Sequence, residues 1–454
     1  MRLAWLSPWP PQSSGIAGRS AALVARLAAA GHAIDVFVDA RAVPAAPIDR
    51  AASPAPPEPG RTRVLSAHEL VWRHARAQYD LPIYQLGNST QHAYIWPYLF
   101  RWPGLAVLHD ARLHHARGHA LLSRHRTADY RAELAFDQPD TPVAAAELGI
   151  AGFDGPYYAL WPMTRAVVAA SRVTAVHTRG GAAALAAASP DARIEYVPLG
   201  DGRDDPLADD ERRAARAALG FSDEAIVFGA FGGLTADKRI PQILRAFAAT
   251  RQRMPRARLL LAGAADPAVD IASLADALGV RDAIVLAGVL DDDAFDRAIA
   301  AVDVSLNLRW PTAVETSGPW VRAIAAARPT IVISLAHQAH VPSLDPRDWS
   351  RSHPALDPVT VAIDIVDEDH SLTLAMRRLA MDAELRTSLG RAARAYWQAE
   401  HSEARMTDAF VRIMTAAAEI PEPQAALPRH LRPDPSRHVA DVLADFPSIS
   451  CEFF

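Results

Sequence analysis

The stretch MRLAWLSPWPPQSSGIAGRSAALVARLAAAGHAIDVFVDA, residues 1–40, decides the fold of this chain. The short apolar run RLAWLSP predicts a buried strand, and a glycine-containing loop separates it from the helical pattern GRSAALVARLAAAG, which ends at Gly31. The run AIDVFVDA then predicts a second strand. Strand, helix and strand in this order form a βαβ unit, whose two strands lie parallel in one sheet.

The same alternation continues along most of the chain. Strand-like runs follow at LPIYQLG, GLAVLHD, RVTAVHT and RIEYVPLG, and alternation restarts at AIVFGAFG and runs on to TIVISLA. We therefore predict an α/β protein with two Rossmann-like, doubly wound domains that face each other across a cleft. Ligands of such sheets bind at the carboxyl ends of the strands.

At 454 residues the chain is too long for one core, which favours two domains. We expect an N-terminal domain over 1–200, an acidic, Pro-containing linker over 201–216 and a second domain over 217–390. Helices over 391–420 are expected to cross back to the first domain, and a Pro-rich tail covers 421–454. Disorder and a strap across the surface both stay open for that tail.

Net charge, cysteine count and the lengths of apolar runs exclude several classes of protein. A formal net charge of −5 gives no reason to expect a nucleic-acid partner, and the single cysteine, Cys451, excludes a disulfide framework and a thiolate metal site. The first strand leaves no room for a signal peptide, and no uncharged apolar run reaches the length of a membrane span. We expect a cytoplasmic protein without a transmembrane span, and leave peripheral contact with the cytoplasmic face of a membrane open.

Lys238, in FGGLTADKRI (residues 231–240), is the only lysine among 47 basic residues. An ammonium is a compact point charge, whereas a guanidinium is a planar fork, so a single surviving lysine suggests a role that arginine fills poorly. The ordinary alternative is a solvated lysine at a helix start, which the helix dipole disfavours.

The segment LRWPTAVETSGPWVRAIAAARPTIVIS, residues 308–334, predicts a strand end, a loop with Glu315 and a helix opened by Gly318 and Pro319. Amide groups at a helix start form an anion site, to which the hydroxyls of Thr316 and Ser317 could contribute. Helix capping is the ordinary use of such hydroxyls, but it does not explain the neighbouring carboxylate.

The part ETSGPWVRAIAAARPTIVIS resembles the donor-binding segment of the retaining GT-B glycosyltransferases of family 4, and the resemblance spans roughly residues 1–415. That family has a Glu, seven residues and a second Glu, which contact the transferred sugar and the ribose. Glu315 matches the first. The second falls on Ala323, with Arg322 beside it, so the ribose contact and the nucleotide stay open.

The resemblance assigns further donor-binding residues. The family places an Arg, and six residues later a Lys, on the donor diphosphate; Lys238 matches the Lys, while the Arg position falls on Gly232, followed by Gly233. Arg239 is the candidate substitute for the missing Arg. Gly15, in the first loop, matches the position where backbone lies against the sugar nucleotide.

In the first domain His109 ends a predicted strand, at a position where the family keeps a His near the transferred sugar. The alternative is a merely hydrogen-bonded histidine. Asp110 is expected to orient His109 or contact the acceptor, and Asn88 and His92 are candidates for the acceptor side.

The resemblance thus implies transfer of a sugar, with retention of configuration, from a nucleoside-diphosphate sugar to a saccharide or lipid-linked acceptor. Glu315, His109 and Lys238 are the implied catalytic residues, with no metal and no other cofactor. Polysaccharide biosynthesis is the implied setting.

Three other classes stay open: a sugar-nucleotide epimerase of the same architecture, a nicotinamide dehydrogenase, and a degenerate sugar-nucleotide-binding scaffold. An epimerase needs an acid–base pair that the sequence does not reveal. A dehydrogenase needs G-x-G-x-x-G, of which SSGIAGR has two glycines.

Two histidine- and arginine-rich patterns have simpler explanations. His115 and His119 share a helix face but lack a third ligand, which favours solvated histidines over a metal site. The run ARLHHARGHALLSRHRTADYR, residues 111–131, favours a solvated helix face over an anionic lipid surface or a lipid-pyrophosphate acceptor, because it lacks an apolar stripe.

Overall fold

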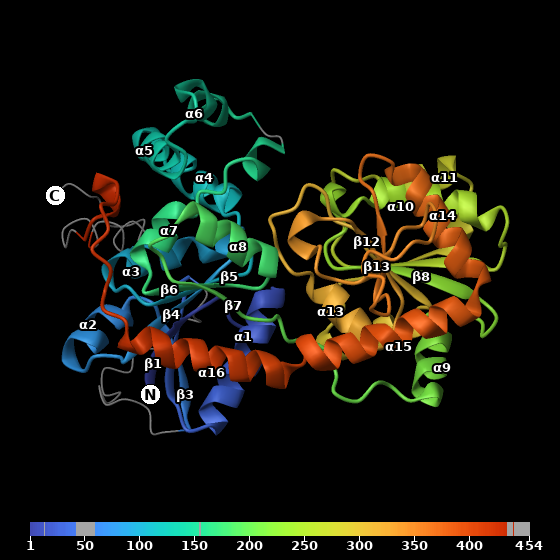
Figure 1. Cartoon of the computed structure of the whole chain (residues 1–454), viewed down its shortest axis with the longest axis horizontal. Coiled ribbons are helices and arrows are strands. Elements are labelled where there is room, and N and C mark those ends of the chain that lie inside the picture. The colour runs from blue at the N-terminus through green and yellow to red at the C-terminus, as the bar shows by residue number, and fades with distance from the viewer. Residues whose placement is uncertain (13, 42–59, 154–155, 434–438, 440–454) are drawn as a thin grey trace. The chain divides into compact units, whose positions relative to one another are not determined.

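A computed structural model describes residues 1–12, 14–41, 60–153, 156–433 and 439. The chain forms two compact units, whose elements Figure 1 labels. The first unit comprises Met1–Val197, Ala313–Glu315 and Thr407–Phe454, and the second comprises Pro198–Thr312 and Thr316–Met406. The first unit is therefore assembled from both ends of the chain.

The first unit contains a seven-stranded parallel sheet with helices packed against it (Figure 1). The strand order is β3-β2-β1-β4-β5-β6-β7. The strands are β1 Arg2–Leu6, β2 Ala33–Val38, β3 Thr62–Ser66, β4 Leu81–Leu86, β5 Leu105–Leu108, β6 Val173–Val176 and β7 Ile194–Tyr196. The α-helices are α1 Gly15–Ala29, α2 Glu69–Arg76, α3 Trp96–Arg101, α4 His114–Leu122, α5 Thr127–Asp137, α6 Val143–Ile150, α7 Arg165–Ala170, α8 Arg179–Ala188 and most of α16 Glu403–Glu419.

The second unit repeats this plan with the strand order β10-β9-β8-β11-β12-β14-β13, again all parallel. The strands are β8 Ile226–Phe231, β9 Ala257–Ala262, β10 Ile284–Gly288, β11 Val304–Asn307, β12 Thr330–Ile333, β13 Ser343–Leu344 and β14 Thr360–Ile363. The α-helices are α9 Asp209–Ala218, α10 Ile240–Arg251, α11 Ile271–Ala277, α12 Asp292–Ala301, α13 Gly318–Ala325, α14 Glu368–Met381 and α15 Ala383–Glu400. Two parallel, doubly wound sheets confirm the predicted fold class.

Helix α1 illustrates how the sequence produces these elements. The Ser14 hydroxyl accepts a hydrogen bond from the Ile16 amide (3.2 Å), so the helix begins at Gly15, three residues before the predicted pattern. Its apolar positions Leu23, Val24 and Leu27 are buried at helical spacing. The helix ends at Ala29, just ahead of Gly31, whose φ of 91° suits a glycine.

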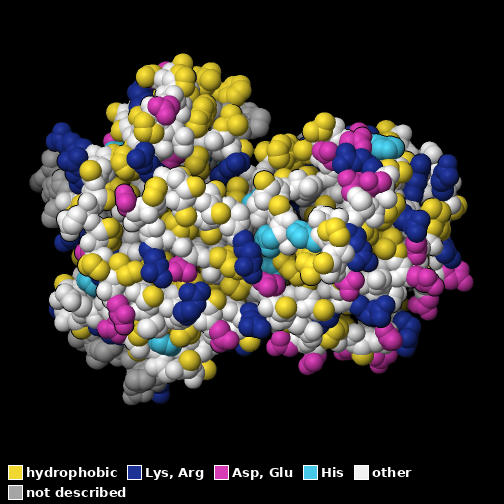
Figure 2. All heavy atoms as spheres, in the orientation of Figure 1, with side chains coloured by type: hydrophobic (Ala, Val, Ile, Leu, Met, Phe, Trp, Pro, Cys, Tyr) yellow, Lys and Arg dark blue, Asp and Glu magenta, His cyan; other side chains and the backbone are white. Residues whose placement is uncertain are grey.

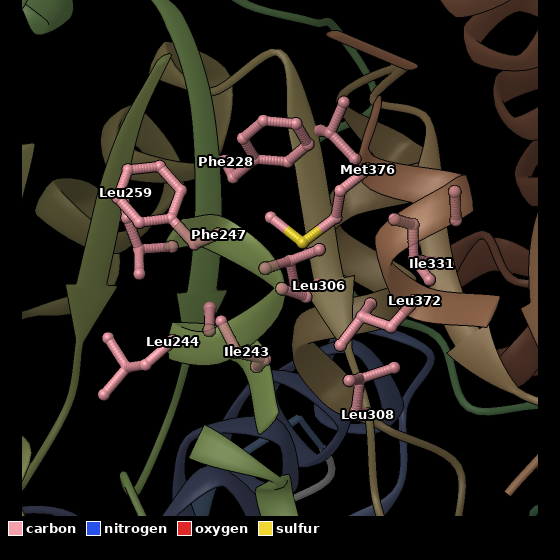
Figure 3. Packing of buried hydrophobic residues seen from close by; sticks show 14 of the residues in the cluster. Phe228, Ile243, Leu244, Phe247, Leu259, Leu306, Leu308, Ile331, Leu372 and Met376 are labelled. Carbon is pink, nitrogen blue, oxygen red and sulfur yellow. The ribbon is translucent and has the colours of Figure 1, made fainter. Parts of the chain in front are cut away.

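Figure 3 shows the main core of the second unit. Side chains from neighbouring strands meet side chains from α10 and α14, and each buried side chain of this size contributes about 1.5–3 kcal/mol. The labelled residues come from the strands and their ends (Phe228, Leu259, Leu306, Leu308, Ile331), from α10 (Ile243, Leu244, Phe247) and from α14 (Leu372, Met376).

Residues 201–216, predicted as a linker, include the first two turns of α9. Their charged residues suit a helix, since three acids occupy its first turn and Arg216 its last. The buried Arg216 guanidinium donates to the carbonyl oxygens of Ala301 (2.9 Å) and Ala225 (2.6 Å). The charged residues that suggested a linker therefore include part of helix α9, which Arg216 ties to neighbouring carbonyl oxygens.

The described part of the Pro-rich tail packs on the first unit. Leu427 and Leu431 belong to the core of that unit, and residues 434–438 and 440–454, with Cys451, lie outside the described residues. Helix α16 precedes the tail, and its Phe410 ring centroid lies 5.4 Å from that of Trp5 in β1. The N-terminal strand and the C-terminal helix thus share one core.

Basic and acidic side chains are interspersed over the visible face of each unit (Figure 2). None of the helices in the described residues has the length and the apolar character needed to cross a membrane.

Candidate functional site

The candidate residues of the second unit gather at the carboxyl end of β8, a central strand. Strand β8 ends at Phe231, and Gly232 follows with a φ of 84°. A Cβ placed on Gly232 would lie 2.4 Å from Nζ of Lys238 and 3.7 Å from Cγ of Pro319. The ammonium group and the first turn of α13 therefore meet at Gly232. We call Gly232, Lys238 and Ser317–Pro319 the lysine cluster.

The backbone holds the Lys238 ammonium in place. Its Nζ donates a hydrogen bond of 2.6 Å to the carbonyl oxygen of Phe231, the last residue of β8. Since Gly232 has no side chain, the ammonium can lie against the strand end. A fixed positive charge at this edge of a doubly wound sheet suits an anionic ligand.

Helix α13 adds amide groups to the same cluster. The Ser317 hydroxyl caps the helix by accepting from the Trp320 amide (3.4 Å), and Pro319 occupies the first turn. Ser317 therefore has the capping role that the sequence left as an alternative. The positive end of the helix dipole still lies beside Lys238, so both features favour a negative charge there.

Gly263 positions the cluster, although the sequence analysis did not single it out. It follows β9 with a φ of 155°, and a Cβ on it would lie 1.9 Å from the Gly232 carbonyl oxygen. The ends of β8 and β9 are further tied by the Leu234 amide, which donates to the Ala264 carbonyl (2.7 Å). Only a glycine permits this approach. The signal was present in ARLLLAG, where a glycine ends a buried apolar run.

The two arginines predicted to contact the donor have carboxylate partners. Arg239 forms a two-point ion pair with the buried Glu368, with distances of 2.8 Å and 2.5 Å, and hydrogen bonding to Glu368 raises its pKa. Arg322, in the last turn of α13, donates hydrogen bonds to the carboxylates of Asp201 (2.7 Å) and Asp292 (2.9 Å). Both guanidinium groups thus have carboxylate partners, whereas the Lys238 ammonium lies at Gly232 beside the first turn of α13.

Gly233 and Thr316 flank the lysine cluster. Gly233 is exposed, and a Cβ on it would only touch Cγ2 of Thr235 at 3.8 Å. Thr316 is half-buried, one residue before the helix cap. Both are next to the lysine cluster in sequence.

In the first unit, His109 lies at the end of β5 with its ring fixed. Its Nε2 lies 2.8 Å from the side-chain oxygen of Gln85, so this nitrogen carries the proton and donates. Burial, the neighbouring His177 and Arg19 lower the pKa of His109 well below its ordinary value, so the imidazole is neutral. Its Nδ1 is buried and has no hydrogen-bond partner among the described residues. Gln85, which the sequence analysis missed, sets this tautomer.

The predicted acceptor-side residues interlock around Gly87. A Cβ on Gly87 would lie 2.8 Å from Nε2 of His92 and 3.3 Å from Oδ2 of Asp110. The Asp110 carboxylate accepts from the Asn88 amide (2.6 Å), and the Asn88 side-chain oxygen accepts from the Ala116 amide (3.0 Å). The fold therefore brings Asn88, His92 and Asp110 together, and gives Asn88 and Asp110 backbone partners.

Gly15 and Glu315 also belong to the first unit. Gly15 is the exposed first residue of α1, and a Cβ on it would lie 3.2 Å from a terminal nitrogen of Arg19. Glu315 is half-buried and follows Val314, whose φ of 62° is strained for a β-branched residue. Such strain concentrates at functional sites, which makes this loop a candidate.

The run 111–131 does not form a solvated face throughout, in contrast to the favoured expectation. His115 and His119 are exposed, but His114 is buried and its ring nitrogens lie 2.8 Å from the Tyr130 hydroxyl and 2.9 Å from the Trp161 carbonyl oxygen. Arg117 is buried as well. Within the described ranges, no three His, Cys, Asp or Glu residues are grouped as metal ligands.

Two buried histidines make the first unit sensitive to acid. Burial lowers the pKa of His92 and of His114 to about 4 each. Below pH 6.5 the unfolded chain therefore binds protons that the folded unit does not, and stability falls as the pH falls towards 4. We expect a loss of about 1.4 kcal/mol per pH unit for each histidine.

Urea unfolding of the protein between pH 7 and pH 4.5, followed by circular dichroism, measures this loss. We expect His92→Gln to flatten the pH dependence, whereas His115→Gln, at an exposed position on α4, leaves it unchanged. An equal pH dependence in His92→Gln and the wild type would contradict the assignment.

Comparisons with known proteins find similarity in structure alone. No protein-family model matches the chain, and no curated protein sequence matches it. Among solved structures, sucrose-phosphate synthase from Thermosynechococcus elongatus matches with a TM-score of 0.62 and 17% identity, over 92% of this chain and 98% of that one. HepE from Anabaena, in complex with UDP and glucose, matches with a TM-score of 0.57 and 12% identity, over 92% and 100% of the two chains.

WaaG, a glycosyltransferase involved in lipopolysaccharide biosynthesis, matches with a TM-score of 0.56 and 15% identity, over 90% of this chain and 99% of that one. These matches cover nearly the full length of each protein, and their low identities restrict the conclusion to architecture. The two parallel seven-stranded sheets, with their interleaved helices, give this chain the GT-B fold.

Proposed function

We propose that the protein is a glycosyltransferase that moves a sugar from a nucleoside-diphosphate donor to a saccharide or lipid-linked acceptor. The observation that carries the proposal is the meeting of the Lys238 ammonium and the start of α13 at Gly232. The resemblance of residues 315–334 to the retaining family 4 enzymes supports it, as do structural neighbours that bind UDP and UDP-glucose.

The proposed chemistry is mainly electrostatic. When the bond between the sugar and the diphosphate breaks, negative charge grows on the departing phosphate and positive charge on the sugar ring. Lys238 and the first amides of α13 would stabilise the phosphate in a fixed geometry, which is the largest contribution in many enzymes. In this proposal these residues stabilise the departing charge, and no metal takes part.

The other candidate residues have roles on the sugar side in this proposal. Glu315 would hold sugar hydroxyls, and neutral His109 would offer its buried Nδ1 as a hydrogen-bond acceptor. Gln85 would keep that tautomer by accepting from Nε2. Asn88, His92 and Asp110 would shape the acceptor side, and Gly15 would let backbone approach the donor. We propose retention of configuration and a cytoplasmic or peripheral membrane setting on the resemblance alone.

A thermal-shift screen with UDP-, GDP-, ADP- and dTDP-sugars tests the donor assignment. A ligand at 100 times its dissociation constant stabilises the folded state by about 2.7 kcal/mol, so we expect one nucleotide class to raise the melting temperature. The Lys238→Ala variant should lose most of this shift.

Slow hydrolysis of the same donor in the absence of acceptor would then distinguish an enzyme from a sugar-nucleotide-binding scaffold. Failure of all four classes to shift either protein would overturn the donor assignment. The anomeric configuration of the product, read by proton NMR, would test retention.

A further inference from the structure

The first unit contains a cavity of about 200 Å³ that none of the residues assigned to the proposed site lines. It is lined by Arg41 after β2, by the segment from Thr90 through α3, by α4 and the turn after it, and by the tail. The lining residues are Arg41, Thr90, Ala93, Trp96, Pro97, Phe100, Arg101, Arg117, His119, Ala120, Ser123, Arg124, Arg126, His430, Leu431, Arg432 and Pro433. We call this space the arginine cavity.

The charged side chains that line the arginine cavity are all basic, although carboxylates outside the lining pair with Arg41, Arg117 and Arg126. Six arginines and two histidines are among its lining residues, and no aspartate or glutamate is, as far as the chain is described. A concave surface lined by one sign of charge concentrates the field and attracts counter-ions. The chain as a whole is acidic, so its overall charge does not explain this concentration.

A buried network fixes the inner arginine of the cavity. Arg117 is 6% exposed, and its Nε and one terminal nitrogen donate to Glu133 at 2.6 Å and 2.5 Å. His430 from the tail lies 2.6 Å from the same carboxylate. Arg117 and His430 lower the pKa of Glu133 although its burial acts in the opposite direction, so Glu133 is ionised. Removing these charged groups from water costs free energy, which only close, well-oriented pairing offsets.

The network orients Arg117 toward the cavity. Its second terminal nitrogen has no hydrogen-bond partner in the described part of the chain, and its guanidinium carbon lies 4.6 Å from the centroid of the Trp96 ring. Stacking and the ion pair together hold the guanidinium in one plane. A fixed guanidinium with a donor to spare matches the oxygens of a phosphate.

The rim of the cavity adds two exposed arginines to this buried one. Arg101 and Arg432 are exposed; among the described residues Arg101 forms no ion pair with a carboxylate, and Arg432 donates to the Leu427 carbonyl oxygen at 2.9 Å. Trp96, Pro97 and Phe100 provide an apolar wall between these groups. The cavity thus combines a charged floor, a charged rim and a surface for an uncharged part of the ligand.

We propose that the arginine cavity binds a ligand that carries a phosphoryl group, as a phosphomonoester or a diphosphate. The group is either part of a soluble molecule or the headgroup of an anionic lipid. The proposal does not rest on the function proposed above, because the cavity lies wholly within the first unit and the lysine cluster within the second.

Isothermal titration of the full-length protein with inorganic pyrophosphate tests the proposal. The Lys238→Ala variant serves as the background, so that binding at the lysine cluster does not contribute. We expect Arg101→Ala together with Arg432→Ala to weaken binding at least about tenfold. The matched control is Arg131→Ala with Arg193→Ala, which removes two exposed arginines of the same unit outside the cavity and should change binding less than about twofold.

Cosedimentation with vesicles of phosphatidic acid, whose headgroup is a phosphomonoester, and phosphatidylcholine, against vesicles of phosphatidylcholine alone, distinguishes the two sources. Binding of pyrophosphate that the cavity substitutions abolish assigns a soluble ligand. Binding of anionic vesicles alone, abolished by the same substitutions, assigns a lipid headgroup. Absence of both, or an equal loss in the cavity variant and the matched control, would overturn the proposal.

Discussion

Lys238→Ala is expected to lower kcat for the proposed sugar transfer by about 10²- to 10³-fold, the usual cost of removing one fixed group that stabilises a developing negative charge. The ammonium is bound to the Phe231 carbonyl oxygen, so its position is set before any ligand arrives. Removing it should weaken donor binding, and even at saturating donor the departing phosphate lacks its cation. Initial rates of product formation at saturating donor measure the loss.

Two further variants make this result specific. Lys238→Arg keeps the charge but not the compact geometry at Gly232, so we expect it to recover less than about a tenth of the lost rate. Arg245 in α10 is exposed and pairs with Asp369, which is also exposed. Arg245→Ala should therefore leave kcat within about twofold of the wild-type value. If Lys238→Ala retained the rate of the Arg245→Ala control, the lysine cluster would not be the phosphate site.

Gly263→Ala is expected to cost more than about 3 kcal/mol of the free energy of unfolding, because the new Cβ would meet the Gly232 carbonyl oxygen at 1.9 Å. Backbone, unlike the end of a flexible side chain, cannot move aside without shifting β8 or β9. A shift of β8 would move Gly232 and the Phe231 carbonyl oxygen that binds the Lys238 ammonium. Donor binding should therefore be lost even if the protein still folds.

Gly279→Ala provides the control for backbone strain. Gly279 also has a positive φ, of 66°, but a Cβ there meets no atom within 4 Å. We expect it to cost only about 1 kcal/mol and to leave donor binding unchanged. Urea unfolding gives the two energies, and nucleotide-sugar titration gives the affinities. Equal costs at both positions would show that the strand ends separate easily and that Gly263 does not position the lysine cluster.

The strands were predictable because parallel strands buried on both faces consist of short apolar runs. RLAWLSP and AIVFGAFG correspond to β1 and β8, and both strands are almost wholly buried. Helix α9 was missed because its many charged residues resemble a linker, whereas the fold buries Arg216 and satisfies its guanidinium with carbonyl oxygens. Composition alone does not reveal such partners.

The candidate site likewise contains residues that local sequence predicts and partners that it does not. Lys238 and the start of α13 were identified from local sequence, and the structure brings them together at Gly232. The partners of Arg239 and Arg322 were not predictable, because Glu368 and Asp201 are each more than 100 positions distant in sequence. Gln85 was missed for a related reason: its role depends on His109, which lies on a neighbouring strand.

The first unit is built from segments that are distant in sequence, which has a consequence for its folding during translation. Trp5 is translated some 400 residues before Phe410, yet the rings of these two residues pack against each other. All of the second unit, Pro198–Met406 apart from residues 313–315, emerges in between. Until α16 is translated, the apolar surface that Phe410 covers at Trp5 lacks this partner, and we expect such surface to favour chaperone binding during translation.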